Sequence, residues 1–369
     1  MELKEKVKEV EGEEVRDEKG EERQSNGSLA IKARFFIPPE VEVLLPGLAL
    51  TAFISALALH TGSQLTYVTP LIASLGIGML ISNLFIVPST YKPGIYFSMR
   101  QILRLAVALL GIRITVDTII GLGWQGLLIA IVPLILTFIF TLLMGKVLKV
   151  PGTSALLIAT GTSICGAAAI LTIGALTRAR DQNILVAIAS ITVFGTFLML
   201  IYPFLFKLGL LPLNESQYGH LVGASVHEVA QVVTAAFAGG EVSGKIGILI
   251  KLTRVIALIP LAFIIAYLVS LGKLKMEDKS VKRQITAPLF LLGFALMVTL
   301  NSLGFFTPKA VKWIEFFDMF LFMMAMAGMG LETDFRALLK IGFRPFFLSL
   351  FATIFISGIS LILIVMLLK

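Results

Sequence analysis

Hydrophobic residues occur along the chain in long runs, separated by short polar or charged segments. The runs cover residues 44–59, 68–87, 101–116, 126–148, 154–176, 184–206, 219–238, 246–271, 286–303, 314–331 and 343–368. About 20 residues of helix cross the hydrocarbon core of a bilayer. Alternation with a period of two, the mark of a membrane barrel strand, is absent. The pattern therefore predicts an all-α integral membrane protein with about 10–11 transmembrane helices.

Composition supports this environment. Hydrophobic residues make up 57% of the chain and charged residues only 15%, whereas about a quarter of a soluble domain is charged. The single cysteine, Cys165, excludes an intrachain disulfide. The high hydrophobic and low charged fractions make the lipid bilayer the first expected partner.

The N-terminal segment differs from the rest of the chain. Its first 28 residues contain ten acidic and six basic side chains and no apolar run that could serve as a signal peptide. We expect residues 1–34 to form a charged, disordered cytoplasmic tail and residues 35–369 to form the transmembrane domain. Because the first 28 residues carry a net charge of −4, the formal net charge of +8 leaves +12 on the rest of the chain. This positive charge reflects membrane topology, so no nucleic-acid partner is expected.

The distribution of Lys and Arg predicts the orientation. If the N-terminus is cytoplasmic and all eleven runs cross, twelve basic residues lie in inner loops and six on the outer side. The positive-inside rule favours this orientation in the inner (cytoplasmic) membrane of a cell. Arg178 and Arg180 are the exception, because this count leaves them outside.

Two segments indicate internal repeats. "LLGIRITVDTIIGLGW" at 109–124 can be laid over "GMGLETDFRALLKIGF" at 328–343, which matches Gly111 with Gly330 and Gly123 with Gly342. Inverted repeats of this kind are common in secondary transporters. A chance match of glycines is the alternative.

Two shorter segments share a pattern of small and polar residues. "GTSICGAAAI" starts at residue 161 and "GASVHEVAQV" starts 62 residues later, at 223. They fall on the fifth and seventh runs, which would point the same way if both crossed. Either one of them re-enters the membrane without crossing, or the two share chemistry without being related by the repeat.

Clustered Gly, Ser and Thr in the middle of an apolar run predict a discontinuous helix, because backbone groups freed in hydrocarbon need protein, water or a ligand. The amides that begin a second half-helix favour an anion. The expected substrate-binding residues in these segments are Thr160, Gly161, Thr162, Ser163, Gly166, Ser225, His227 and Gln231. The alternative is that small residues only let helices pack closely.

Ionisable residues inside the runs carry the functional prediction. A charge near the bilayer centre costs about 2.5 kcal/mol or more, so Glu228 needs a partner or a role. Lys251 and Arg254, one turn apart, either neutralise Glu228 or help to bind an anionic substrate. A salt bridge that only locks two helices is the alternative. We expect Glu228 to be the ion-coupling group, with His227 as a proton relay.

These expectations give two geometric hypotheses. Residues 160–166 and 223–228 should be broken helix segments that face each other across a cavity. Lys251 or Arg254 should lie within salt-bridge reach of Glu228 or line the same cavity.

Two motifs that indicate other chemistry are incomplete. "HEVAQ" has Gln231 where a zinc protease has its second histidine, and the chain holds only three histidines. "GGEVSGKI" has Ile246 where a phosphate-binding loop has Ser or Thr. We therefore expect no metal site, no catalytic residues and no cofactor.

The stretches "GTSICGAAAI", "GASVHEVAQVV", "KLTRV" and "LRLAVALLGIRIT" resemble the YeiH family of membrane proteins, which are labelled sulfate exporters. The resemblance runs from about residue 35 to the end. It implies a relation to the cation/proton antiporter and bile-acid symporter group, with inverted repeats, discontinuous helices, and a scaffold beside a mobile core that contains residues 153–239.

Together these points predict a secondary active transporter that exports a small anion, similar to sulfate, sulfite or a sulfonate, by alternating access. Coupling to H+ or Na+ is expected, and a homodimer is left open. A cation/proton antiporter or an anion channel is the alternative. An enzyme is not expected, because no nucleophile, base and orienting group converge in the sequence.

Overall fold

The computed structural model describes residues 39–64, 69–271, 290–333 and 342–368. The chain divides into two units, Met1–Val43 and Leu44–Lys369, and the second contains everything discussed below. The expected tail, residues 1–34, lies outside the described residues.

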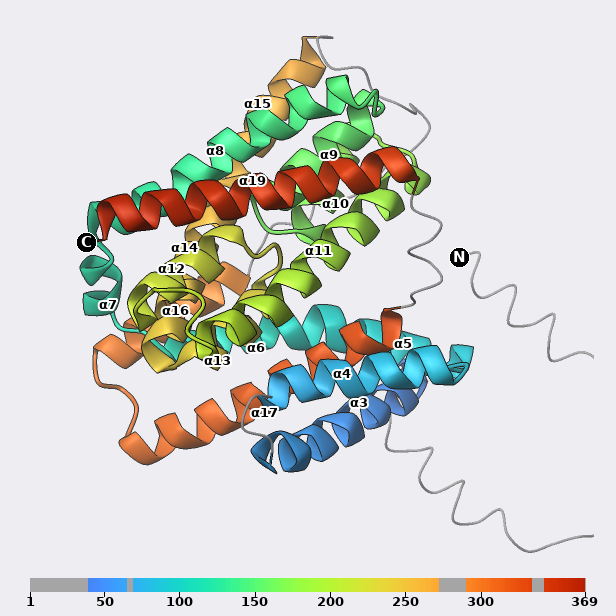
Figure 1. The fold of residues 1–369 in the computed structure, drawn as a ribbon. Coiled ribbons are helices and arrows are strands. Elements are labelled where there is room, and N and C mark those ends of the chain that lie inside the picture. The colour runs from blue at the N-terminus through green and yellow to red at the C-terminus, as the bar shows by residue number, and fades with distance from the viewer. Residues whose placement is uncertain (1–38, 65–68, 272–289, 334–341, 369) are drawn as a thin grey trace, which may run out of the picture. The chain divides into compact units, whose positions relative to one another are not determined.

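The described residues form helices without any strand (Figure 1). The elements are α3 (Pro39–Gln64), α4 (Pro70–Leu84), η1 (Ser89–Tyr91), α5 (Lys92–Phe97), η2 (Ser98–Ile102), α6 (Leu103–Leu109), η3 (Leu110–Arg113), α7 (Val116–Gly121), α8 (Gly123–Val147), α9 (Gly152–Ser163), α10 (Ala167–Leu176), α11 (Asp181–Lys207), α12 (Glu215–Ser225), α13 (Val229–Gly239), α14 (Glu241–Ile256), α15 (Leu258–Ser270), α16 (Phe290–Ser302), α17 (Pro308–Glu332) and α19 (Phe343–Leu367).

Within the described part, seven helical stretches are long and apolar enough to cross a bilayer. This confirms the all-α membrane fold. The remaining four apolar runs of the sequence form the shorter helices α4 and α16 and two broken helices, α9–α10 and α12–α13. The predicted discontinuous helices are therefore confirmed, and seven of the 10–11 expected transmembrane helices are found as long apolar stretches within the described residues.

Several helix starts are fixed by local sequence. Thr69 and Thr307 each cap a helix through the side-chain oxygen and precede a proline in the first turn, where the missing N–H costs nothing. Asn214 and Gln217 form a reciprocal capping box at the start of α12. These caps set where α4, α17 and α12 begin.

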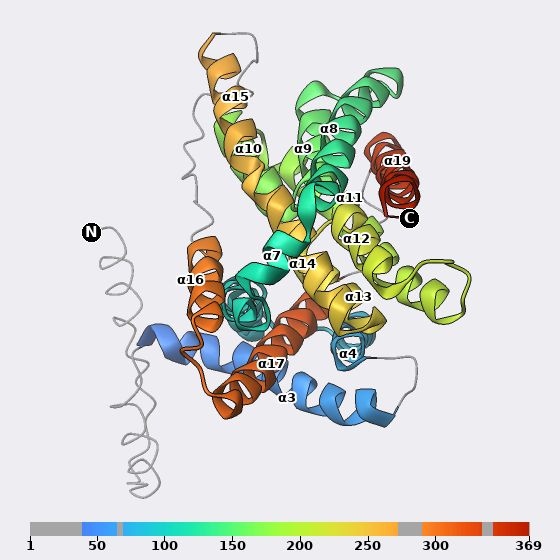
Figure 2. The ribbon, with the colours of Figure 1, turned by 90° about the vertical axis from the view of Figure 1, so that its left-hand side faces the viewer.

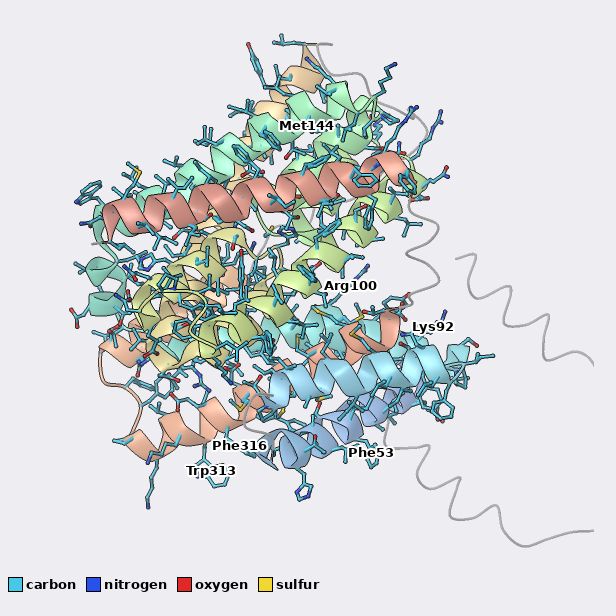
Figure 3. All side chains as sticks on the ribbon, viewed as in Figure 1. Phe53, Lys92, Arg100, Met144, Trp313 and Phe316 are labelled. Atoms are coloured by element: carbon cyan, nitrogen blue, oxygen red, sulfur yellow. The ribbon has the colours of Figure 1, made fainter. Side chains whose placement is uncertain are left out.

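Large apolar side chains project outward from the long helices. Phe53 on α3 and Trp313 and Phe316 on α17 are 68%, 73% and 53% exposed, and Figure 3 shows them pointing away from the helices. Extensive apolar exposure of this kind is rare on soluble monomers. These faces are suited to lipid.

The first broken helix is a hairpin. α9 and α10 are joined by Ile164–Gly166 and lie antiparallel, since Leu157 on α9 reaches Gly174 on α10 and Gly161 packs against Ile170. Helices of 12 and 10 residues are about 18 and 15 Å long, roughly half of the 30 Å hydrocarbon core. This segment, hairpin 1 (residues 152–176), therefore enters the membrane and returns to the same side.

The second broken helix is built in the same way. In hairpin 2 (residues 215–239), the Tyr218 hydroxyl near the start of α12 donates a hydrogen bond to the Ala235 carbonyl near the end of α13, at 3.0 Å. Each of its helices has 11 residues. Hairpin 2 is therefore also re-entrant.

The long helix α11 joins the two hairpins, which consequently open at opposite ends of α11. Figure 1 shows α9 and α10 beside one end of α11 and α12 and α13 beside the other. Each hairpin is followed by a span, residues 181–207 after hairpin 1 and 241–270 after hairpin 2. The two motifs that are 62 residues apart thus belong to two hairpin-and-span units of inverted direction. The sequence had offered two alternatives, re-entry of one motif or shared chemistry without the repeat. Re-entry of both was not considered, because an apolar stretch of 25 residues fits a crossing and a hairpin equally well.

This topology changes the side assigned to Arg178 and Arg180. Because hairpin 1 returns to where it started, these residues lie at the same end as Lys146 and Lys149, which precede the hairpin. The exception to the positive-inside count disappears. The cytoplasmic location of that end stays a prediction.

Gly123 and Gly342, matched in the sequence, occupy equivalent places. Gly123 begins α8 and Gly342 caps α19, and both helices have 25 residues. They pack antiparallel, with Arg344 donating to the Lys149 carbonyl at 3.5 Å. Much of the second copy, residues 334–341, lies outside the described residues.

The helices of Leu44–Lys369 pack in two groups. α4 contacts α17, and α16 contacts α6 and η3, while α8, α9, α11, α12, α14 and α19 contact one another. Figures 1 and 2 both show α4 and α17 in the lower part and α8, α9, α10 and α19 in the upper part. The division into scaffold and mobile core stays a prediction.

The re-entrant topology can be tested by cysteine labelling. In a Cys165→Ser background, we expect Lys149→Cys and Arg178→Cys to react with an impermeant thiol reagent from the same side of the membrane, and Leu210→Cys from the other side. Labelling of Arg178→Cys from the side opposite to Lys149→Cys would show that hairpin 1 crosses.

Candidate functional site

The tips of the two hairpins meet beside α14, which supplies two buried cations. Lys251 and Arg254 are both 0% exposed. They lie three positions apart and so share one face of the helix. Everything in the candidate site is arranged around them.

Arg254 binds the carbonyl ends of both hairpins. Its Nε and Nη2 donate to the Ser163 carbonyl at 3.0 and 2.7 Å, and Nη2 also donates to the Thr162 carbonyl at 3.0 Å. Its Nη1 donates to the carbonyls of Gly223 and Ala224. All five N–H groups of the guanidinium are thereby used.

Lys251, one turn earlier on α14, also binds backbone carbonyls of both hairpins. Its Nζ donates to the carbonyls of Ile164 at 2.7 Å and Val226 at 2.9 Å, and to the carbonyl of His227. An ammonium has three donors. Lys251 therefore has none left.

These carbonyls are the C-terminal ends of α9 and α12. The last carbonyls of a helix lack partners within it and carry about half a negative charge. Two helix ends thus point at two cations, which stabilise them inside the membrane. The donors of Lys251 and Arg254 are occupied by these carbonyls, and a part for the two cations in substrate binding stays a prediction.

Glu228 lies on the other face of the hairpin tips. It is the N-cap residue of α13, and its Oε1 accepts a hydrogen bond from Thr192 Oγ1 on α11 at 3.1 Å. Its backbone N–H donates to Gln231 Oε1 at 3.1 Å, and Gln231 Nε2 donates to Thr196 Oγ1 at 3.2 Å. Lys251 is near enough for its charge to act on Glu228, but the ion pairs of the described residues do not join the two.

The two tips touch directly. Gly166 has φ of +72°, a conformation that favours glycine, and a Cβ there would lie 2.5 Å from Glu228 Cγ. The segments 160–166 and 223–228 are therefore in contact at this point, and a cavity between them stays a prediction. Position 166 therefore requires glycine, both for its positive φ and for the close approach of the Glu228 side chain.

The two faces of the tips differ in exposure. The segments 163–166 and 225–227 are buried, whereas Ala168 is exposed and Ala167, Glu228 and Val229 are partly exposed. The exposed residues begin α10 and α13, whose first amides have no acceptor within their helices. The accessible face thus presents two positive helix ends beside one carboxylate.

His227 is buried and its hydrogen position follows from its partner. Thr353 Oγ1 donates to the Ser349 carbonyl, so it must accept from His227 Nε2, which lies 2.9 Å away. Nε2 therefore carries the hydrogen, and Nδ1 is a buried acceptor without a hydrogen-bond partner. The ring contacts α19 and does not reach the accessible face.

The other predicted residues are placed inside the hairpins. The hydroxyls of Thr160 and Ser225 donate to carbonyls of their own helices, those of Leu156 and Leu221, and the Ser225 hydroxyl also lies 3.1 Å from the Tyr202 hydroxyl. Gly161 packs against Ile170. A separate group is formed by Thr162 and Ser163, whose hydroxyls are buried without a hydrogen-bond partner. These residues shape the tips, while Glu228 and Gln231 contact Thr192 and Thr196 on α11.

Two sets of residues near these sites were not predicted from the sequence. Thr192 and Thr196 carry no charge and have no distinguishing signal in an apolar run. Arg113 and Asp318, which lie 3.8 Å apart between Nε and Oδ2, could have been found, because each is a charge inside a predicted span, as Glu228 is.

Two opposed re-entrant hairpins, anchored by buried cations of a neighbouring span, define an α-helical integral membrane protein with a polar centre inside the membrane. The profile of the family described as "Conserved hypothetical protein 698" matches residues 46–349. The chain belongs to this family.

Similar proteins carry the name UPF0324 membrane protein. One from Bacteroides thetaiotaomicron is 35% identical over 83% of this chain and 94% of its own length. Others from Pseudomonas aeruginosa (34% identical, 86% and 94% covered) and Listeria monocytogenes (32%, 87% and 95%) match to a similar extent. The resemblance seen in the sequence is thus supported as membership of a membrane protein family, and the sulfate-export label stays a prediction.

The anchoring role of Lys251 gives a stability prediction. Lys251→Met leaves three buried carbonyls without a donor, so we expect the free energy of unfolding to fall by about 3 kcal/mol or more, measured by denaturant titration in detergent. Lys245→Met is the matched control on the same helix, since its i,i+4 pair with Glu241 is partly exposed and contributes about 0.5 kcal/mol or less. Equal stability of the two variants would contradict the anchoring role.

Proposed function

We propose that this protein is a secondary active transporter that moves a small anion, of the sulfate, sulfite or sulfonate class, by alternating access. The observation that carries the proposal is the pair of opposed hairpins whose tips present helix N-termini on an accessible face. Discontinuous helices of this kind form substrate sites in many transporters, where half-helix N-termini bind anionic groups.

The charge balance at the tips supports an anionic substrate. Lys251 and Arg254 contribute two positive charges, and Glu228 contributes one negative charge when ionised. The C-terminal ends of α9 and α12 and the N-terminal ends of α10 and α13 carry about half a charge each, of opposite sign. The centre therefore has a surplus of about one positive charge, which an anion would neutralise.

Lys251 and Arg254 are proposed to act on the substrate indirectly, through their charge and through the backbone that they hold. They hold the carbonyl ends of α9 and α12 on one face, so that the amides of α10 and α13 remain for the substrate on the other. Ala167 and Ala168 of hairpin 1 and Glu228 and Val229 of hairpin 2 border that face. A substrate bound there would contact both hairpins at once.

Glu228 is the proposed coupling group. An anion and the ionised carboxylate compete for the same positive potential, so anion binding favours the protonated carboxyl and anion release favours proton loss. By linkage, each ligand changes the affinity for the other by the same factor. A proton gradient could then drive export of the anion.

We also propose an orientation in the membrane and a division into mobile core and scaffold. The end of the helices that carries Lys146, Lys149, Arg178 and Arg180 is proposed to face the cytoplasm, in the inner membrane of the cell. The hairpins, with α11 and α14, would form the mobile core, and α4 and α17 would belong to the scaffold.

A proteoliposome uptake screen tests the class of transport and the substrate together. Sulfate, sulfite, sulfonates and carboxylates should be offered with and without proton and sodium gradients. Saturable uptake with counterflow supports a carrier. Flux that does not saturate would favour an anion channel, and exchange of cations for protons alone would favour a cation/proton antiporter.

Glu228→Gln tests the coupling. The amide keeps the shape and can still meet Thr192, so the protein should fold, while the pH dependence of uptake should disappear and only gradient-independent exchange should remain. Asp117→Asn on the exposed surface of α7 is the control and should behave like the native chain. An unchanged rate and pH profile in Glu228→Gln would show that the carboxylate is structural.

A further inference from the structure

A second pair of ionisable residues lies away from the hairpin tips. Asp318 on α17 and Arg113 on η3 line a small cavity that also reaches α4 and α13. Their side chains are 1% and 10% exposed. Neither residue contributes to the site proposed above.

No described residue donates a hydrogen bond to Asp318. Both carboxylate oxygens are buried without a partner. The nearest cationic atom, Arg113 Nε, is 3.8 Å from Oδ2, which is too far for a hydrogen bond. A buried carboxylate in this state is costly unless something else satisfies it.

Arg113 interacts with several neighbours, so it does not by itself satisfy the Asp318 carboxylate. Its Nη2 donates to the Glu315 carbonyl at 3.0 Å, and its Nη1 lies 3.8 Å from Glu241 at the start of α14. The guanidinium also lies over the Phe237 ring of hairpin 2, 5.2 Å from the ring centroid. Its Nε is buried without an acceptor.

The other walls of the cavity are apolar. They consist of Leu71, Leu110, Val233, Phe237, Met319 and Phe322. A hard metal cation takes several oxygen ligands, and these side chains provide none. An anion would be repelled by Asp318. The proton is the ligand that a single carboxylate can bind without further oxygen atoms.

We propose that Asp318 is a proton-binding site, separate from Glu228, with Arg113 as its counter-charge. A proton from water binds one carboxylate oxygen and converts the carboxylate to a neutral carboxyl. Glu241 is then the remaining carboxylate beside Arg113, so protonation transfers the attraction of Arg113 from α17 toward α14 and the end of hairpin 2.

The charged groups that face this site come from three elements. Arg113 lies on η3 and Glu315 on α17, one turn before Asp318. Glu241 lies on α14, with Lys245 3.7 Å from its Oε1. The contributions of α4 and α13 to the cavity are apolar.

Infrared difference spectroscopy during a pH titration tests the proposal. The reconstituted full-length protein, without any substrate, should show the carbonyl stretching band of a protonated carboxylic acid. Aspartate labelled with carbon-13 at the side-chain carboxyl should shift this band, which identifies it as aspartate even if no variant folds. Asp318→Asn should abolish the shifted band above about pH 5, where ordinary aspartates are ionised.

Controls separate this site from the others. The aspartate band should remain in Glu228→Gln and in the exposed variant Asp117→Asn, and in Arg113→Gln it should persist to more alkaline pH because the opposing positive charge is gone. Absence of a labelled aspartate band above about pH 5, where ordinary aspartates are ionised, or its retention there in folded Asp318→Asn protein, would overturn the proposal. Since the measurement reports proton binding alone, failure of the transport proposal would leave this result intact, and the reverse also holds.

Discussion

The structure depends on how two cations satisfy broken backbone inside a membrane. Lys251 and Arg254 together donate to seven carbonyl oxygens, all from the ends of α9 and α12 or the loops that follow them. In hydrocarbon these carbonyls would have no water, and the cations would have no counter-charge. The cations supply hydrogen-bond donors to the carbonyls, and the carbonyls supply partial negative charge to the cations. The two hairpins can therefore end in the middle of the bilayer, and their tips are held against the same helix.

This anchoring also gives the tips two different faces. Because the carbonyl ends of α9 and α12 are sealed against α14, the amide ends of α10 and α13 are left on the opposite face, beside Glu228. Small residues make the arrangement possible. Gly166 brings the two tips into contact, and Gly195 on α11 leaves room for Gln231, whose Oε1 would clash with a Cβ there. The polarity of the site is thus a property of helix direction as much as of side chains.

Hairpin 2 links the two ionisable regions. Glu228 begins α13, and Phe237, near its end, lies under Arg113. Eleven residues of helix separate the ends of α13 by about 16 Å. A displacement of this hairpin would change the surroundings of Glu228 and of the Arg113 and Asp318 pair together. The same rigid element therefore contacts a group in the central site and a group in the cavity beside α17.

The sequence by itself determined the environment, the helical class and the places where helices break. Apolar runs match helices because hydrocarbon requires internal hydrogen bonding, and the Gly, Ser and Thr of residues 160–166 mark a real interruption. The ionisable residues Glu228, Lys251 and Arg254 were recognisable because buried charge is costly. Only the tertiary structure decided the rest. An apolar stretch of 25 residues is compatible with a crossing or a hairpin, and the choice depends on antiparallel contacts such as that of Tyr218 with Ala235. The carbonyls that Arg254 binds lie about 30 and 90 residues away, and backbone carbonyls, present in every residue, leave no trace in a sequence.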